Sequence, residues 1–465
     1  MDHLEKIVDI ALNLNYEDIP SEAILASKKD ILDTLGCILA GTDAEGTKEL
    51  FEVISDWGGK EESTVLYHGL KVPAPYAALI NGTLAHARDF DDTHDEGIVH
   101  AGISIIPSAL AAAEIAGDCD GKTLLKAITI GLDLMCRLGK AATIGPTQIG
   151  LVYTSTFAYF GSALTAGLIL KLNKEQLINA IGITLSQVAG TVQAVTDAAL
   201  TKRIQPSFGA QAGVMAAILA KKGITGAKNV FDGQYSFPKV YLNNQFNYDV
   251  FFDSYGSYFE SSNLGFKPYP CCRFTHPSID ATLQIRQENE LNFKDIEEII
   301  VNVGPQANVV CEPVERRKKP QVVVDAQFSI PYTVAVALQK GKVFVDDFTP
   351  EAISDKEVLS LAAKVTTRYD EDLGTMGISP AIVMIRMKNG QIYSKRVDYP
   401  LGSIENSMSF IDIVEKFKKC ASLTPYKMDV NSMNEVIARV EGLESVKNAI
   451  EICNLLIMDP ALVKN

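Results

Sequence analysis

The 465-residue sequence lacks the common motifs of nucleotide-binding proteins and hydrolases. It has no G-x-G-x-x-G after a strand, no G-x-S-x-G and no H-E-x-x-H. The sequence motifs that usually indicate nucleotide binding or serine hydrolysis are therefore absent. Its eight cysteines include no C-x-x-C pair and no metal-finger or cluster-ligand spacing. We therefore expect reduced, buried thiols, and neither a metal nor an iron-sulfur cofactor. The segment GDCDGKTLLK departs from a phosphate loop because Gly117 is one residue too close to Gly121, and it predicts a helix start.

Positive charge and long apolar runs are also scarce. The chain has 43 Lys and Arg against 57 Asp and Glu, a net charge of -14, which argues against nucleic acids and anionic membranes as partners. No apolar run is long enough to span a bilayer, and the 47% hydrophobic share is ordinary for a soluble enzyme. The N-terminus lacks the basic start and apolar core of a signal peptide, so we expect a cytoplasmic protein. An anionic ligand would need cations concentrated locally.

The hydrophobic pattern predicts a mainly α-helical fold with two domains. Apolar residues recur at helical spacing from Ser21 to about residue 222 in segments rich in Ala and Gly, with no convincing strand. Farther on, DIEEIIVNVG predicts a strand, and AIVMIRMKNGQIYSKRV predicts a hairpin around Asn389-Gly390. We expect an all-helical domain in residues 1–262, a smaller α+β domain in 263–401, and C-terminal helices in 402–465 that rejoin the helical domain.

Residues 81–108 carry an unusual density of titratable groups. This stretch contains three of the six histidines and five acids, and apolar helical sequence flanks it on both sides. We predict a helix that ends near Phe90 and a loop that runs to about Gly102, where buried helices would hold a reactive site. The alternative is a solvated acidic loop. A metal held by the acids with His94 and His100 is disfavoured, because the carboxylates are consecutive rather than spaced to converge.

Three other segments combine cations or proton carriers with Gly, Pro or aromatic residues. TKRIQPSFGAQAG contains Lys202, FKPYPCCRFTHPSID contains Lys267, Arg273 and His276, and DAQFSIPYTVAVAL contains Tyr332. Each has an ordinary structural explanation. These are a solvated helix start, an interdomain hinge with a hydrogen-bonded histidine, and a tyrosine packed in a helical core.

Together with NGTLAHARDFDDTH, these segments resemble the MmgE/PrpD family in order and spacing, and the resemblance extends along nearly the whole chain. The family includes 2-methylcitrate dehydratase, cis-aconitate decarboxylase and iminodisuccinate epimerase. The resemblance implies an all-helical domain with an inserted α+β lid, a site between the two, and a homodimer.

The resemblance also implies roles for individual residues. The expected catalytic residues are His100, Asp89, His276 and Tyr332. The expected substrate-binding residues are Thr93, Lys202, Lys267 and Arg273. The sequence departs from the family pattern where many members carry a histidine, because GLVYTSTFAYFG places Val152 there, and Gln205 stands where several relatives have histidine.

An acid, a base and fixed cations are what dehydration of a β-hydroxy polycarboxylate requires. The resemblance therefore implies a cofactor-independent lyase for a small di- or tricarboxylate, in the first place a dehydratase of a 2-methylcitrate-like hydroxy acid. The same groups would serve a decarboxylase of a cis-aconitate-like acid, or an epimerase at a carbon next to a carboxylate. A non-catalytic polycarboxylate-binding protein is the alternative from a different class.

Overall fold

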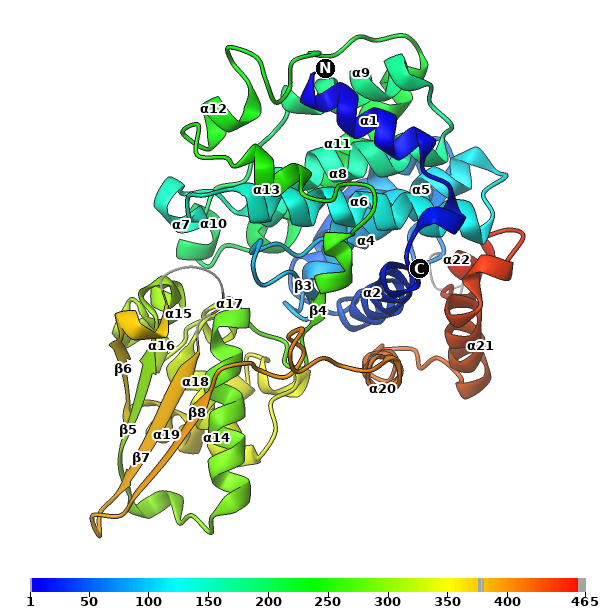
Figure 1. Ribbon diagram of the computed structural model, residues 1–465. Helices are drawn as coiled ribbons and strands as arrows, with labels where there is room; N and C mark the ends of the chain where they lie inside the picture. The colour runs from blue at the N-terminus through cyan, green and yellow to red at the C-terminus, as the bar shows by residue number, and fades with distance from the viewer. Residues whose placement is uncertain (1, 375–377, 379, 459–465) are drawn as a thin grey trace.

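The computed structural model describes residues 2–374, 378 and 380–458. It consists of a large helical domain and a smaller lid built on a four-stranded sheet (Figure 1). The predicted fold class, mainly helical with an inserted α+β lid, is confirmed. The helical core draws on residues from Leu4 to Phe266 and again from Met408 onward, whereas the lid core draws mainly on residues 271–397.

The centre of the helical domain is a set of closely packed, almost fully buried helices. They are α4 (Ala74–His86), α5 (Gly102–Ala116), α6 (Gly121–Ala141), α8 (Tyr153–Ile169) and α11 (Thr201–Lys221). Glycine permits the close contact of α11 with α8. A Cβ atom added at Gly209 would lie 2.5 Å from the Ala158 side chain, and one at Gly213 would lie 2.4 Å from Ser162. The Ala- and Gly-rich composition of this region therefore reflects short distances between helices.

Further helices surround this centre. They are α1 (His3–Asn13), α2 (Ser21–Ala40), α3 (Thr47–Trp57), α7 (Pro146–Ile149), α9 (Lys174–Leu185), α10 (Gln193–Thr196), α12 (Phe237–Tyr241) and α13 (Tyr248–Phe252). The C-terminal helices are α20 (Phe410–Ala421), α21 (Val430–Glu441) and α22 (Glu451–Leu455). The chain leaves the lid through α20, which lies beside α2 (Figure 1), where a Cβ at Gly36 would meet the Phe417 Cα at 3.2 Å.

The helical half also contains two short strand pairs that the sequence did not predict. β1 (Ser63–Thr64) pairs with β2 (Lys71–Val72), and β3 (Asp92–Thr93) pairs with β4 (Gly265–Phe266), both antiparallel. Runs of two residues are too short to give a period-two pattern. The second pair is important for the site, because it fastens the acidic stretch to the segment that enters the lid.

The lid sheet has the strand order β6-β5-β7-β8. Its strands are β5 (Ile296–Val303), β6 (Val365–Tyr369), β7 (Ala381–Met387) and β8 (Ile392–Val397). β5 is parallel to β6 and antiparallel to β7, and the predicted hairpin of β7 and β8 is confirmed, with Gly390 at a φ of 88° in its turn. The lid helices are α14 (His276–Glu288), α15 (Asn308–Cys311), α16 (Val314–Lys318), α17 (Val323–Gln327), α18 (Ile330–Lys340) and α19 (Lys356–Ala362).

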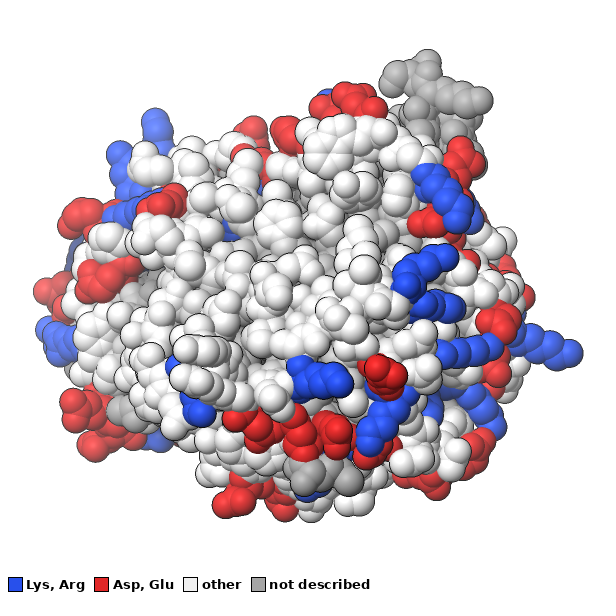
Figure 2. Space-filling view, turned by 90° about the horizontal axis from the view of Figure 1, so that it is seen from above, with Lys and Arg blue, Asp and Glu red and all other residues white. Residues whose placement is uncertain are grey.

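Charge is distributed unevenly on the surface. Seen from above, charged side chains lie mostly around the edge of the molecule, and the middle of that face is largely uncharged (Figure 2). Among the residues that the structure describes, no helix is both long enough and apolar enough to cross a membrane.

Candidate active site

The acidic stretch after α4 is buried, so the alternative of a solvated loop is wrong. α4 ends at His86, earlier than predicted, and Asp89 follows with a φ of 53°, a left-handed conformation that is uncommon outside glycine. Such backbone strain persists only where surrounding contacts fix it, and it is concentrated at functional sites. Five polar residues of the stretch are at most 2% exposed: Asp89, Asp91, Asp92, Thr93 and His94.

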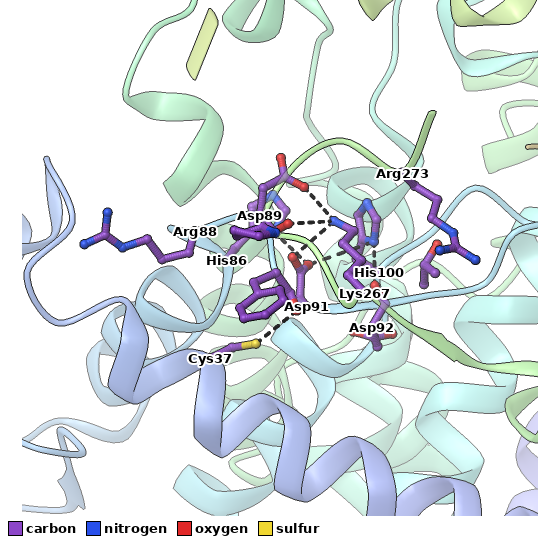
Figure 3. Close-up of polar contacts among 12 residues, drawn as sticks. Cys37, His86, Arg88, Asp89, Asp91, Asp92, His100, Lys267 and Arg273 are labelled. Atoms are coloured by element: carbon purple, nitrogen blue, oxygen red, sulfur yellow. Dashed lines mark hydrogen bonds and ion pairs between the residues drawn. The ribbon is translucent and has the colours of Figure 1, made fainter. Parts of the chain in front are cut away.

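Two lysines from distant parts of the chain meet the Asp89 carboxylate. Lys202 at the start of α11 donates to Oδ2, and Lys267, directly after β4, donates to Oδ1 at 2.5 Å. Lys267 also lies 3.4 Å from Asp91, and Figure 3 shows it in the middle of this cluster. Burial opposes ionisation of Asp89, but the lysines outweigh burial and hold the pKa of its carboxyl well below the usual value. The two cations are therefore concentrated at the site, but both are paired with carboxylates.

His100 lies at the pocket, and one of its ring nitrogens is hydrogen-bonded to the backbone. Its Nδ1 is 2.6 Å from the backbone carbonyl oxygen of Asp92, and because a carbonyl only accepts, Nδ1 carries the hydrogen. Burial, followed by the positive charge of Lys267, lowers the pKa of His100 to about 4. The imidazole is therefore neutral near pH 7, and its Nε2 presents a lone pair. In this protonation state, His100 is a base.

The backbone around His100 is fixed on both sides. The Asp92 carboxylate accepts hydrogen bonds from the amides of Ala101 at 2.8 Å and Gly102 at 3.0 Å, at the start of α5, and the His100 amide donates to Thr154 Oγ1 of α8 at 3.0 Å. Glycine is required at position 102, where a Cβ would lie 2.4 Å from an Asp30 oxygen. His100 is thus positioned by the two central helices rather than by a free loop.

Arg273 joins the lid to the acidic stretch. Its Nε and Nη2 donate to the Asp95 carboxylate at 3.1 Å and 2.9 Å, and its Nη1 donates to the Leu401 carbonyl at 3.0 Å. His276 is fully buried behind it, with Nε2 donating to the Cys271 carbonyl at 3.1 Å and Nδ1 3.2 Å from Arg273 Nη1. Burial and the Arg273 charge hold the pKa of His276 well below its usual value, so His276 is a neutral acceptor that orients Arg273.

These groups line a pocket of about 130 Å³ between the helical domain and the lid. Its polar lining includes His86, Asp89, Thr93, His100, Thr154, Lys202 and Arg273. The remaining wall is mostly apolar and includes Leu151, Val152, Val192, Val195, Phe274, Val309 and Phe328. This volume suits a ligand smaller than the drug-sized molecules that occupy pockets of roughly 300–1,000 Å³.

The structure brings together most of the residues that the sequence singled out. Asp89, Thr93, His100, Lys202 and Arg273 line the pocket. Lys267 and His276 contact Asp89 and Arg273, respectively, and are fully buried.

Tyr332 is the exception. It was expected at the substrate, but it does not line the pocket. The side chain is fully buried in the lid core, and its hydroxyl donates to the Asp347 carbonyl at 2.6 Å. The core-packing explanation therefore fits this residue. The structure adds His86, Thr154 and Asp91, which the sequence analysis left out of the site. His86 belongs to the same dense stretch, but its helical position concealed that it faces the pocket.

Comparison with known proteins identifies the relatives of this chain. The MmgE/PrpD N-terminal domain matches residues 5–249, and the MmgE/PrpD C-terminal domain matches residues 269–439. The chain belongs to the MmgE/PrpD family.

Individual relatives match along most of their length. A cis-aconitate decarboxylase from Aspergillus terreus is 24% identical over 97% of this chain and 95% of its own. The cis-aconitate decarboxylase of Homo sapiens is 28% identical over 93% and 90%. A 2-methylcitrate dehydratase from Salmonella typhimurium is 23% identical over 89% of each chain. This member of the family is therefore similar to enzymes named for two different reactions.

Proposed function

We propose that this MmgE/PrpD protein is a lyase that decarboxylates a small tricarboxylate of the cis-aconitate type. The relatives support decarboxylation better than the dehydration ranked first from the sequence, because the decarboxylases reach 24–28% identity over 93–97% of the chain, against 23% over 89% for the dehydratase. The structural observation that carries the proposal is that His100 and Lys202 line the same small, partly apolar pocket.

The reaction consumes one proton. The bond between a methylene carbon and its carboxylate breaks, carbon dioxide leaves, and the electron pair forms a new double bond to the central carbon. The electrons of the former double bond take a proton at the other alkene carbon. His100 is the group that would hold this proton. The negative charge of a bound polycarboxylate raises the pKa of a nearby imidazole, so binding of substrate converts His100 from a base into an acid.

The surroundings of the pocket favour loss of carbon dioxide. Lys202 would hold one carboxylate, whereas a carboxylate against Val152 and Leu151 would be poorly solvated. Converting a poorly solvated anion into neutral carbon dioxide relieves the cost of burying its charge. Val152 is important here, because a histidine in its place would solvate that carboxylate.

Dehydration of a 2-methylcitrate-like acid is the second candidate. The observation that favours it is the neutral state of His100, whose free Nε2 suits removal of a proton next to a carboxylate. Dehydration also needs an acid for the departing hydroxyl.

Product analysis tests the proposal. Purified protein is incubated separately with cis-aconitate, 2-methylcitrate and iminodisuccinate in deuterated water, and NMR follows each reaction. Decarboxylation of cis-aconitate with one deuterium incorporated per turnover, lost in His100→Gln, is the expected result. Faster loss of water from 2-methylcitrate would overturn the proposed decarboxylase in favour of a dehydratase. Faster exchange at the α-carbon of iminodisuccinate would overturn it in favour of an epimerase. Binding of a polycarboxylate without any reaction would show a binding protein.

A further inference from the structure

A second histidine, His86, faces the pocket beside His100. It is the last residue of α4, its side chain is 3% exposed, and it lines the pocket. Its Nδ1 lies 2.8 Å from Asp91 Oδ2, so this nitrogen is committed to the carboxylate and Nε2 remains for the pocket. The ring centroids of His86 and His100 are 5.9 Å apart (Figure 3). Two imidazoles thus approach one small cavity, each with Nδ1 anchored by an acceptor.

The charge balance of the pocket gives these imidazoles a role. Lys202 and Lys267 contribute two positive charges, and Asp89 and Asp91 contribute two negative charges. Arg273 is likewise paired with Asp95. A tricarboxylate that enters this site brings up to three negative charges that the lysines and arginine already present do not balance. Uncompensated charge in a buried site is costly, so binding requires a further source of positive charge.

Protons on the two histidines can provide that charge. His86 is surrounded by Asp89, Asp91, Lys202 and His100, and the charged groups facing His100 are Asp89, Asp91 and Lys267. Burial, followed by the charges of the lysines, lowers the pKa of both rings and keeps them neutral near pH 7. A bound polyanion reverses the local field, and Asp91 then stabilises an imidazolium at His86.

We propose that His86, anchored by Asp91, is a second titrating residue of this site, and that binding of a polycarboxylate protonates both His86 and His100. This inference rests on the proposed function, because it assumes a polycarboxylate ligand. The two rings then have separate tasks. His86 holds a substrate carboxylate through a charged N–H, and His100 exchanges the proton at the reacting carbon.

Calorimetry with propane-1,2,3-tricarboxylate tests the inference. This ligand has neither a double bond nor a hydroxyl group, so it binds without reacting. Titration at pH 7.5 in buffers of different ionisation enthalpy counts the protons taken up on binding. We expect uptake of more than one proton by the unsubstituted protein, and about one fewer by His86→Asn, which keeps a donor for Asp91 but has no titrating nitrogen. Binding by that variant should weaken about tenfold. His68→Asn, a histidine outside this pocket, is the matched control and should change neither quantity.

A second measurement uses only the unsubstituted protein, so its result does not depend on whether the variants fold. Imidazole ¹⁵N spectra of the unsubstituted protein should show two of its six histidines change to the imidazolium pattern when the ligand is added. Full proton uptake by His86→Asn, or a single responding histidine, would overturn the role of His86. Failure of the unsubstituted protein to bind any tricarboxylate would contradict the proposed function instead, so the two failures are distinguishable.

Discussion

Lys267 and Asp89 form a buried ion pair, with 2.5 Å between Nζ and Oδ1, that joins the entrance of the lid to the end of α4. The Lys267 and Asp89 side chains are 0% and 3% exposed, so bulk water cannot hydrate either charge. The pair keeps both groups ionised. Burial lowers the pKa of Lys267, but the charges of Asp89 and Asp91 outweigh burial, so the pKa is raised. Lys267 Nζ also lies 3.4 Å from the Asp89 carbonyl oxygen, and this contact helps to hold the left-handed backbone of Asp89.

Lys267→Met should destabilise the protein strongly, because it leaves two buried carboxylates, Asp89 and Asp91, without their shared cation. Breaking a buried pair by removing one partner costs about 3–5 kcal/mol. The midpoint of urea unfolding measures this. The double variant Lys267→Met with Asp89→Asn should recover part of the loss, because one uncompensated charge is removed.

Lys395→Met is the matched control for that substitution. Lys395 pairs with Glu288 on the surface of the lid, where the two side chains are 32% and 55% exposed. Exposed pairs contribute about 0–1 kcal/mol, so the midpoint should change little. Equal effects of the two lysine substitutions would contradict the structural role of the Lys267 pair.

His100→Gln and Lys202→Met should affect different kinetic parameters. Loss of the proton carrier should lower kcat by about 10²–10⁴-fold with KM largely kept. Loss of the Lys202 charge should mainly raise KM, because this side chain lines the pocket and would hold a carboxylate in ground state and transition state alike. Steady-state kinetics on the tricarboxylate that reacts measures both. Equal, mild changes in kcat and KM for the two variants would place the chemistry elsewhere.

Local sequence patterns were sufficient to predict the fold class and several of the elements. The helical spacing of apolar residues, the alternation in Ile296–Val303 and the turn at Asn389-Gly390 each depend on near neighbours in the chain. β6 was not recognised although Val365–Tyr369 is rich in β-branched residues, because it is short and pairs in parallel with β5, 62 or more residues earlier. The two-residue pair of β3 and β4 left no periodic signal at all.

Side-chain orientation within the site was harder to predict. Residue type and order indicated Asp89, His100, Lys202 and Arg273, since charged groups in an apolar setting are conspicuous. The pairing of both lysines with Asp89 depends on distances across the fold that sequence order does not encode. For the same reason, the sequence analysis placed Tyr332 at the site and left His86 out, whereas the structure shows the reverse. Tyr332 faces the lid core within an apolar helix, and His86 turns from the end of such a helix into the pocket.

The stability contribution of His100 should depend on pH. Its pKa is about 4 in the folded protein against an ordinary value of 6.5, so between these values the unfolded chain binds more protons. Its contribution is therefore fully retained above pH 6.5 and is lost as the pH falls toward 4. Relative to His100→Gln, which does not titrate, the unsubstituted protein should lose about 2 kcal/mol between pH 7.5 and pH 5. Urea unfolding of both proteins at several pH values measures the difference, and a constant difference would show that His100 titrates normally.

Arg273→Lys should loosen the lid although the charge is kept. Lysine has a single ammonium group and cannot bond both oxygens of Asp95 and the Leu401 carbonyl in the way the guanidinium does. Hydrogen bonds to charged groups contribute about 1.5–3 kcal/mol, so we expect KM to rise about tenfold or more, because the lid side of the pocket is less well positioned.

The matched control for Arg273→Lys is Arg396→Lys, which alters a pair with Asp398 whose side chains are 51% and 48% exposed and should leave KM unchanged. Asp95→Asn should raise KM in the same direction as Arg273→Lys, and the double variant should cost less than the sum, because both substitutions break the same contact. Strictly additive effects would show that Arg273 acts on the substrate directly and that its contact with Asp95 does not position it.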